Sequence, residues 1–282
     1  MIKTPSPAAY ALLLLAALSS SCASKKPYAT SNKIYQQQVK VIAAEISKPP
    51  LPLTDTLPAE KASEWVGTVN FGMRRPNYVV IHHTAQDSLG QTLKTFTISR
   101  TQVSAHYVIG KDGKVYHMLS DYLRAWHAGN SKWGSITDLN SVSLGIEMDN
   151  NGTEPYTEVQ LNSLLNLLDT IKLNYKIPAD NFIGHGDIAP GRKVDPGVNF
   201  PWKKLAEKGF GIWYSDSLQT PPPAFDPMDG LLIIGYDISR PQDAIKAFKR
   251  HYLPDVAQDA EWTDYALSVL YNLYIKKKTA LL

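Results

Sequence analysis

The chain has 282 residues, of which 44% are hydrophobic and 20% are charged, a globular composition that excludes a disordered or fibrous protein. Its formal net charge of +3 is too small to indicate a nucleic-acid-binding protein. The length allows one sizeable domain and a smaller one beside it.

The N-terminus is typical of an export signal. Lys3 supplies positive charge, and the run from Ala8 to Leu18 is apolar except for Tyr10. This run is shorter than the roughly 20 apolar residues that a membrane-spanning helix needs. It leads through small residues into Cys22, which resembles a bacterial lipobox and predicts a lipid anchor on that cysteine. The alternative is ordinary secretion, with Cys22 removed by a later cut.

We expect residues 1–21 to be a lipoprotein signal peptide and residues 22–60 to be a tether. The tether should contain a helix from Asn32 to Ile46, with Ser31 as its N-cap, followed by a stiff proline-rich linker. Cys22 is the only cysteine, so an internal disulfide is excluded. Since no acidic residue follows Cys22 directly, we expect the outer membrane, facing the periplasm, to hold the anchor.

Residues 61–214 combine strand and helix patterns, which indicates an α/β domain with a mixed central sheet flanked by helices. Apolar β-rich runs predict strands at 78–83, 142–148 and 181–185. A hairpin is predicted from 106–109 and 114–116, around Asp112-Gly113.

Three helices are predicted in the same domain. Ser88 can cap a helix over 91–99, and a third, short helix covers 202–208. Between them, Thr157 and Gln160 predict a capping box for a helix that Pro178 ends. Its apolar face comprises Leu161, Leu164, Leu165, Leu168 and Ile171.

Residues 215–282 predict a linker and a small all-helical module. Pro221 to Pro223 mark the boundary. Two apolar helical faces follow, the first formed by Ala244, Ile245, Phe248 and Tyr252, and the second by Trp262, Tyr265, Ala266, Val269 and Leu270.

The histidines point to metal chemistry. His185 opens a loop rich in proline and glycine that also carries Lys193 and Asp195, and such loops often hold functional groups. Two histidines and one aspartate suit a catalytic zinc ion with an open place for water. The remaining ligand is expected from the strand 78–83, where His82 and His83 point to opposite faces, so only one of them can serve.

Six segments closely resemble the zinc-dependent N-acetylmuramoyl-L-alanine amidases, a family that includes amidase-type phage lysozymes and peptidoglycan recognition proteins. They occur in the family's order and comprise Val80-Ile81-His82-His83-Thr84, Ser104-Ala105-His106-Tyr107, Asp112-Gly113, Ala125-Trp126-His127-Ala128-Gly129, Leu144-Gly145-Ile146-Glu147, and Gly184-His185 through Asp195-Pro196-Gly197.

The resemblance implies a role for each matching residue. It selects His82, His185 and Asp195 as the ligands of Zn²⁺. It also implies that Glu147 transfers the proton and that Lys193 stabilises the oxyanion. Two further matches, Trp126 and His127, are expected to bind substrate, whereas His83 is expected to pack at the rim and His106 to support the site.

The function implied is hydrolysis of the amide between N-acetylmuramic acid and L-alanine, in peptidoglycan or muropeptides, for cell-wall turnover. The expected partners are this substrate and, through Cys22, a membrane; we expect a monomer. Two alternatives are a peptidoglycan-binding receptor without activity and a zinc peptidase that cuts the stem peptide. Segments 235–238 and 244–252 resemble a helical peptidoglycan-binding module, which would either bind the wall or pack against the catalytic domain.

Overall fold

The computed structural model describes residues 26–48, 66, 68–73 and 75–280, within two compact units, Met1–Phe71 and Gly72–Leu282. The predicted signal peptide, Cys22 and most of the proline-rich linker lie outside the described residues. Within the described part of the chain, no helix is both long enough and apolar enough to cross a membrane.

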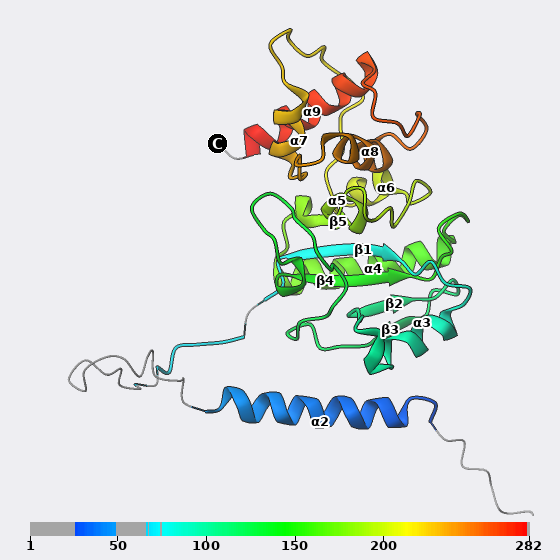
Figure 1. Cartoon of the computed structure of the whole chain (residues 1–282), viewed down its shortest axis with the longest axis vertical. Coiled ribbons are helices and arrows are strands. Elements are labelled where there is room, and N and C mark those ends of the chain that lie inside the picture. The colour runs from blue at the N-terminus through cyan, green and yellow to red at the C-terminus, as the bar shows by residue number, and fades with distance from the viewer. Residues whose placement is uncertain (1–25, 49–65, 67, 74, 281–282) are drawn as a thin grey trace, which may run out of the picture. The chain divides into compact units, whose positions relative to one another are not determined.

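Helix α2, Ala29–Ile46, is the one described helix of the first unit (Figure 1). It begins three residues before the predicted start at Asn32, with Tyr28 rather than Ser31 at the N-cap. The hydroxyl of Ser31 donates to the carbonyl of Tyr28 at 3.1 Å, so Ser31 lies inside the first turn instead of preceding it. None of the residues of α2 is buried.

The second unit is built on a five-stranded mixed sheet with the order β3-β2-β4-β1-β5 (Figure 1). The strands are β1 Tyr78–His83, β2 Tyr107–Ile109, β3 Val115–His117, β4 Ser143–Met148 and β5 Phe182–Gly184. Strands β2, β4, β1 and β5 are parallel, and β3 is antiparallel to β2, which confirms the predicted hairpin. The fold class predicted from the sequence is therefore correct.

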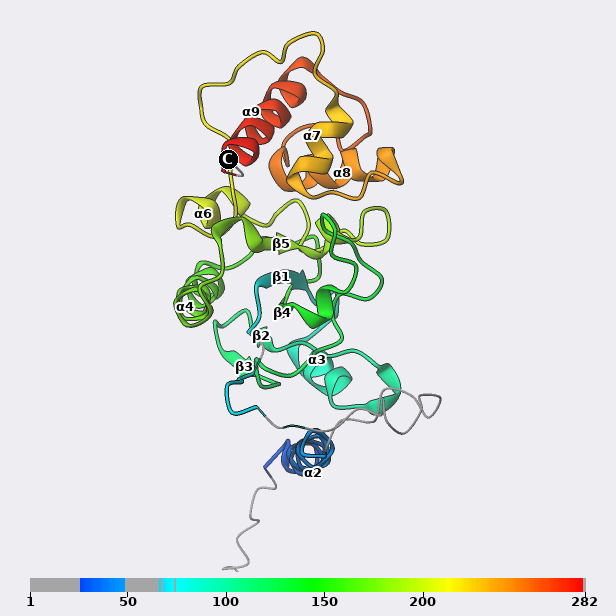
Figure 2. The ribbon, with the colours of Figure 1, turned by 90° about the vertical axis from the view of Figure 1, so that its left-hand side faces the viewer.

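One face of the sheet is closed by helix α4, Glu158–Tyr175 (Figure 2). Leu161, Leu164, Leu168 and Ile171 of α4 are buried against Val79, Ile81, Leu144 and Ile146 of the sheet. The predicted capping box forms only in part. Thr157 accepts from the amide of Gln160, but the side chain of Gln160 is buried and donates to the carbonyls of Ile109 and Asp149 instead.

Short elements connect the strands. Helix α3, Leu89–Phe96, is capped by Ser88, as predicted, but ends three residues earlier than Ser99. The hydroxyl of Thr97 donates to the carbonyl of Lys94 and the helix does not continue. The 3₁₀ turns are η2 Ser99–Thr101, η3 Leu139–Ser141 and η4 Ala179–Asn181; helix α6 spans Trp202–Glu207.

The C-terminal helices are α7 Pro227–Ile234, α8 Pro241–Tyr252 and α9 Asp264–Ala280. Figures 1 and 2 show them beyond the β5 edge of the sheet. Their apolar residues form one core with Val80 of β1, Ile183 of β5 and Ile188, so this module packs directly onto the sheet domain. The predicted face of α9 is buried at Ala266, Val269 and Leu270, whereas Tyr265 is exposed.

Candidate metal centre and active site

The register of three parallel strands aligns three polar residues at the carboxyl edge of the sheet. His82 of β1 pairs with Glu147 of β4, and the preceding residue Ile81 pairs with Gly184 of β5. His185 follows Gly184 directly and opens the one-turn helix α5, His185–Ile188. Paired residues of neighbouring strands face the same side, so His82 and Glu147 lie together on the face opposite α4.

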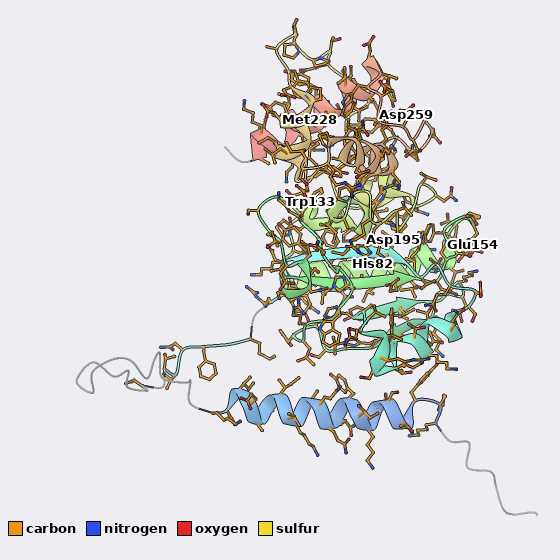
Figure 3. The ribbon with its side chains drawn as sticks, viewed as in Figure 1. His82, Trp133, Glu154, Asp195, Met228 and Asp259 are labelled. Atoms are coloured by element: carbon orange, nitrogen blue, oxygen red, sulfur yellow. The ribbon has the colours of Figure 1, made fainter. Side chains whose placement is uncertain are left out.

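His82, His185 and Asp195 converge in the buried interior (Figure 3, where His82 and Asp195 are labelled). The distance is 2.9 Å between Nδ1 of His82 and Nδ1 of His185. Oδ2 of Asp195 lies 3.1 Å from the first of these nitrogens and 2.9 Å from the second. The three residues are only 2%, 3% and 7% exposed, respectively. The amide of Gly186 donates to the carbonyl of Asp195 at 2.7 Å, and this hydrogen bond holds the end of the loop beside His185.

A hydrogen-bond chain assigns the tautomer of His82. The hydroxyl of Ser143 donates to the carbonyl of Leu139, so it must accept from Nε2 of His127 at 3.3 Å. Nδ1 of His127 then has a free lone pair and accepts from Nε2 of His82 at 3.1 Å. Nδ1 of His82 is therefore left without a proton, facing the cluster.

The second histidine is oriented in the same way. Nε2 of His185 donates to the carbonyl of Ala128 at 3.1 Å, and in the neutral ring, the form that binds metal, Nδ1 then carries no proton. Two nitrogen lone pairs and one carboxylate oxygen then face one another with no hydrogen between them. Such an arrangement is repulsive unless a cation lies among the three atoms, and outward hydrogen bonds of this kind are typical of metal-binding histidines. The residues present thus fit a zinc ion.

The charges of the cluster agree with this assignment. Burial and the neighbouring His185 lower the pKa of His82 to about 4, so its ring is neutral at pH 7. Burial alone would raise the pKa of Asp195, but the contacts of its carboxylate with the adjacent rings of His185 and His82 outweigh burial and hold the pKa well below its usual range. A neutral imidazole and an ionised carboxylate are the forms that bind metal.

Glu147 lies beside the cluster with one carboxylate oxygen, Oε2, buried and without a hydrogen-bond partner among the described residues. Burial, and next the negative charge of Asp195, raise the pKa of Glu147 to about 8, while the charge of Lys193 lowers it. Lys193 is half-buried and also acts electrostatically on His82. The structure thus brings Glu147 and Lys193 to the predicted ligands.

His83 points to the opposite face of β1, as strand geometry requires. Its Nδ1 lies 3.2 Å from the carbonyl of Pro196, the residue after Asp195. The hydroxyl of Tyr156 donates to the same carbonyl at 2.7 Å. His83 therefore supports the loop that carries Asp195 and does not join the cluster.

The two residues expected to contact substrate occupy different places. Trp126 is 51% exposed, and its backbone amide donates to the hydroxyl of Ser104. His127 is buried behind His82, with its ring so close to Gly145 of β4 that any side chain there would clash with it. The burial of His127 does not support substrate contact; its ring contacts His82 instead. His106, also buried, accepts from the amide of Gly145, consistent with a supporting role.

Sequence reasoning missed several residues that orient the site. Asn140 accepts from the amides of His127 and Ala128, and Arg192 donates to the carbonyls of Ala128 and Asn130. Asp187 accepts from His251, which had no predicted role. The available signal was the position of His251 on the buried face of α8, three residues after Phe248.

Known proteins share this sequence and this fold. The N-acetylmuramoyl-L-alanine amidase family matches residues 72–198. The N-acetylmuramoyl-L-alanine amidase AmiD of Escherichia coli is 33% identical over 213 residues, which cover 64% of this chain and 76% of AmiD.

Two solved structures extend the likeness into the C-terminal helices. AmiD of E. coli, in complex with the substrate anhydro-N-acetylmuramic acid-L-Ala-D-gamma-Glu-L-Lys, matches with a TM-score of 0.65 and 28% identity, over 78% of this chain and 97% of that one. AmpDh3 of Pseudomonas aeruginosa matches with a TM-score of 0.66 and 28% identity, over 79% and 99%. The chain therefore belongs to the N-acetylmuramoyl-L-alanine amidase family and is a hydrolase of the amide bond between N-acetylmuramic acid and L-alanine.

Proposed function

We propose that this amidase depends on a zinc ion held by His82, His185 and Asp195. The observation that carries the proposal is the convergence of two deprotonated ring nitrogens and one carboxylate oxygen within hydrogen-bond distance of one another. Two nitrogens and one oxygen from the protein leave an open position, as in catalytic rather than structural zinc sites. When bound, the ion polarises the scissile carbonyl and lowers the pKa of water at that position.

Glu147 is the group that moves the proton. It faces the same side of the sheet as His82, and its buried Oε2 has no competing partner in the described part of the chain. A cation in the cluster would lower its raised pKa, so that the carboxylate can take a proton from the attacking water. As the C–N bond breaks, Glu147 delivers this proton to the departing amine of L-alanine, and the lactyl group of N-acetylmuramic acid, which keeps the oxygen of the water, becomes a carboxylic acid.

Lys193 and Trp126 complete the proposed site. The ammonium group of Lys193 stabilises the negative charge that develops on the carbonyl oxygen. The exposed face of Trp126 packs against the sugar or the peptide of the muropeptide. Trp126→Ala should therefore raise KM with little change in kcat, which steady-state kinetics on a defined muropeptide would measure.

Two other functions were compatible with the residues alone. A receptor without activity typically lacks a ligand, whereas all three ligands and Glu147 are present here. A zinc peptidase would use the same metal chemistry on the stem peptide, and membership in the amidase family argues against it.

Product analysis on a defined muropeptide, with and without a chelator, tests the proposal. We expect mass spectrometry to detect intact stem peptides and the free sugar, no cleavage after chelation, and recovery when zinc is added. Shortened stem peptides would instead identify a peptidase. Full activity after complete removal of the metal would contradict the zinc mechanism.

We also propose that the protein is a monomeric lipoprotein, anchored through Cys22 in the outer membrane and facing the periplasm. The lipobox-like sequence before Cys22 supports this. Cys22→Ala should move the protein from the outer-membrane fraction to the soluble periplasmic fraction. An unchanged distribution would contradict the anchor, and light scattering of the soluble variant would test the monomer.

A further inference from the structure

The C-terminal helices reach the metal site through one buried carboxylate. Asp187, two residues after His185, accepts hydrogen bonds from three donors: the amide of Gly184 at 2.7 Å, the hydroxyl of Tyr236 at 2.9 Å and Nδ1 of His251 at 2.7 Å. Asp187, Tyr236 and His251 are only 4%, 1% and 5% exposed. Gly184 directly precedes His185, so the network fixes the backbone on both sides of this histidine.

The side chain of His251 is itself held by its neighbours. Its ring stacks on Trp202 at a centroid distance of 4.1 Å and on Tyr252 at 4.2 Å. These contacts leave the imidazole little freedom to rotate away from Asp187. Trp133 lies between the sheet and the C-terminal helices (Figure 3). Its ring contacts the ring of Tyr236 edge to face.

Helix α8 also covers the returning loop that carries Asp195. A methyl group on Gly186 would lie 3.3 Å from Nη1 of Arg250 and 3.3 Å from the carbonyl of Asp195, so these groups surround the same glycine. The side chains of Arg250 and His251 line a small cavity together with Asp195 and Pro196. The segments that carry two of the three proposed ligands, His185 and Asp195, thus contact α8, whereas His82 belongs to β1.

We propose that Tyr236 and His251 are positioning residues for the metal site, so that the C-terminal helices act as a part of its frame. They act through Asp187, whose hydrogen bond from the amide of Gly184 holds the backbone that carries His185, and they do not touch the metal or the substrate. Groups that hydrogen-bond directly to a ligand typically change metal affinity 10- to 100-fold when they are removed, and we expect an effect of this order from Tyr236 and His251 through the backbone of His185. This inference rests on the zinc site proposed above.

The chain offers a matched pair of variants. Tyr236→Phe and Tyr252→Phe each remove one hydroxyl from a buried tyrosine of the C-terminal helices or their connections. The hydroxyl of Tyr236 donates to Asp187, whereas no hydrogen bond of the Tyr252 hydroxyl occurs among the described residues. We expect zinc affinity, measured by competition with a chromophoric chelator, to fall roughly 10- to 100-fold in Tyr236→Phe and to stay within about twofold in Tyr252→Phe.

His251 supplies a second pair. His251→Phe keeps an aromatic ring between Trp202 and Tyr252 but loses the donor, whereas His251→Gln restores a donor toward Asp187. Zinc affinity should fall in the first variant and recover at least partly in the second. The absorption spectrum of the cobalt-substituted protein, which reports ligand geometry, should change in Tyr236→Phe and His251→Phe only.

Hydrogen exchange of the unmodified protein provides a test without substitutions. Because coupling between sites is reciprocal, zinc should slow amide exchange in α8, residues 241–252, more than in α9. Equal zinc affinities in Tyr236→Phe and Tyr252→Phe, or no zinc-dependent protection of α8, would overturn this inference. If the unmodified protein bound no zinc, the proposed function would fail instead, which distinguishes the two failures.

Discussion

The two faces of the central sheet differ in what they bury. The face under α4 is mainly apolar, with Leu161, Leu164 and Leu168 packed on β-branched and leucine side chains. The opposite face combines an apolar core at Val80 with the buried polar groups His82, His185 and Asp195. Buried polar groups are costly unless each has a partner, and the second face meets this cost with hydrogen bonds and, we propose, a metal.

The α4 face therefore contributes mainly to stability, whereas the opposite face carries the residues of the site. The residues that pack on the α4 face follow a pattern within single helices and strands. Other apolar side chains that fit the space could replace them. Contacts on the site face are specific, because Nε2 of His82 donates to His127 and Nε2 of His185 donates to the carbonyl of Ala128, which fixes the orientation of each ring. Substitutions on the two faces should therefore fail in different ways.

The largest contrast is expected between the adjacent residues His82 and His83, which face opposite sides. His82→Ala should abolish stoichiometric zinc binding and reduce amidase activity to background, because it removes one of three ligands. His83→Ala should retain zinc and most activity, because Tyr156 still holds the carbonyl of Pro196. Elemental analysis of the purified proteins and the muropeptide assay check both. Loss of zinc in His83→Ala alone would reverse the assignment.

Glu147→Gln should reduce kcat roughly 100- to 10,000-fold, because the amide cannot transfer the proton. Zinc content should not change, and the melting temperature should not fall, because the buried Oε2 of Glu147 has no partner to lose among the described residues. Glu154→Gln, which alters an acid paired with Lys111 outside the cluster, serves as the control. Undiminished cleavage by Glu147→Gln would remove Glu147 from the mechanism.

On the α4 face, Leu164→Ala should lower the free energy of unfolding by about 2–5 kcal/mol, because it leaves a cavity in a closed apolar layer. Zinc affinity and kcat of the folded protein should be unchanged at 25 °C. Urea unfolding and the chelator competition measure the two quantities separately. A large fall in zinc affinity would show that the faces are coupled.

The smallest effect concerns His106, on the site side but outside the cluster. Burial lowers the pKa of His106, and the neutral ring accepts at Nδ1 from the amide of Gly145. A base with a lowered pKa contributes stability above the unfolded value of about 6.5, and this stability is lost as the pH falls below that value. Replacing His106 with Gln, which does not titrate, should reduce the slope of unfolding free energy against pH by at most about 1.4 kcal/mol per unit below pH 6.5. Equal slopes in urea titrations at pH 5, 6 and 7 would contradict this.

Much of the fold could be predicted because its signals are local. The apolar run at 78–83, the Asp112-Gly113 turn and the leucine face of α4 each lie within one element. The details that failed depend on distant partners. Gln160 leaves its capping role because the carbonyls of Ile109 and Asp149 are within reach, and no local pattern signals that contact.

The same distinction holds in the site. Motifs and strand alternation pointed to His82, His185 and Asp195, and the structure brings these three together. The position of His127 could not be predicted, because it depends on Gly145 of another strand leaving room for the ring. Asp187 lay inside a recognised motif, but its donors Tyr236 and His251 come from segments whose resemblance to a helical module gives no sign of a contact with the catalytic domain's motif.

The two hydrogen bonds of Arg192 have a consequence for how this enzyme can diversify. Arg192 joins the loop of Trp126 to the loop of Asp195, and the carbonyl of Ala128 serves both Arg192 and His185. The loop that carries Trp126 and the catalytic centre are thus connected by hydrogen bonds. An insertion between residues 126 and 130 would displace the carbonyl of Ala128 and thereby disturb His185. New substrate preferences can therefore arise more readily through substitution of exposed side chains such as Trp126 than through changes in loop length.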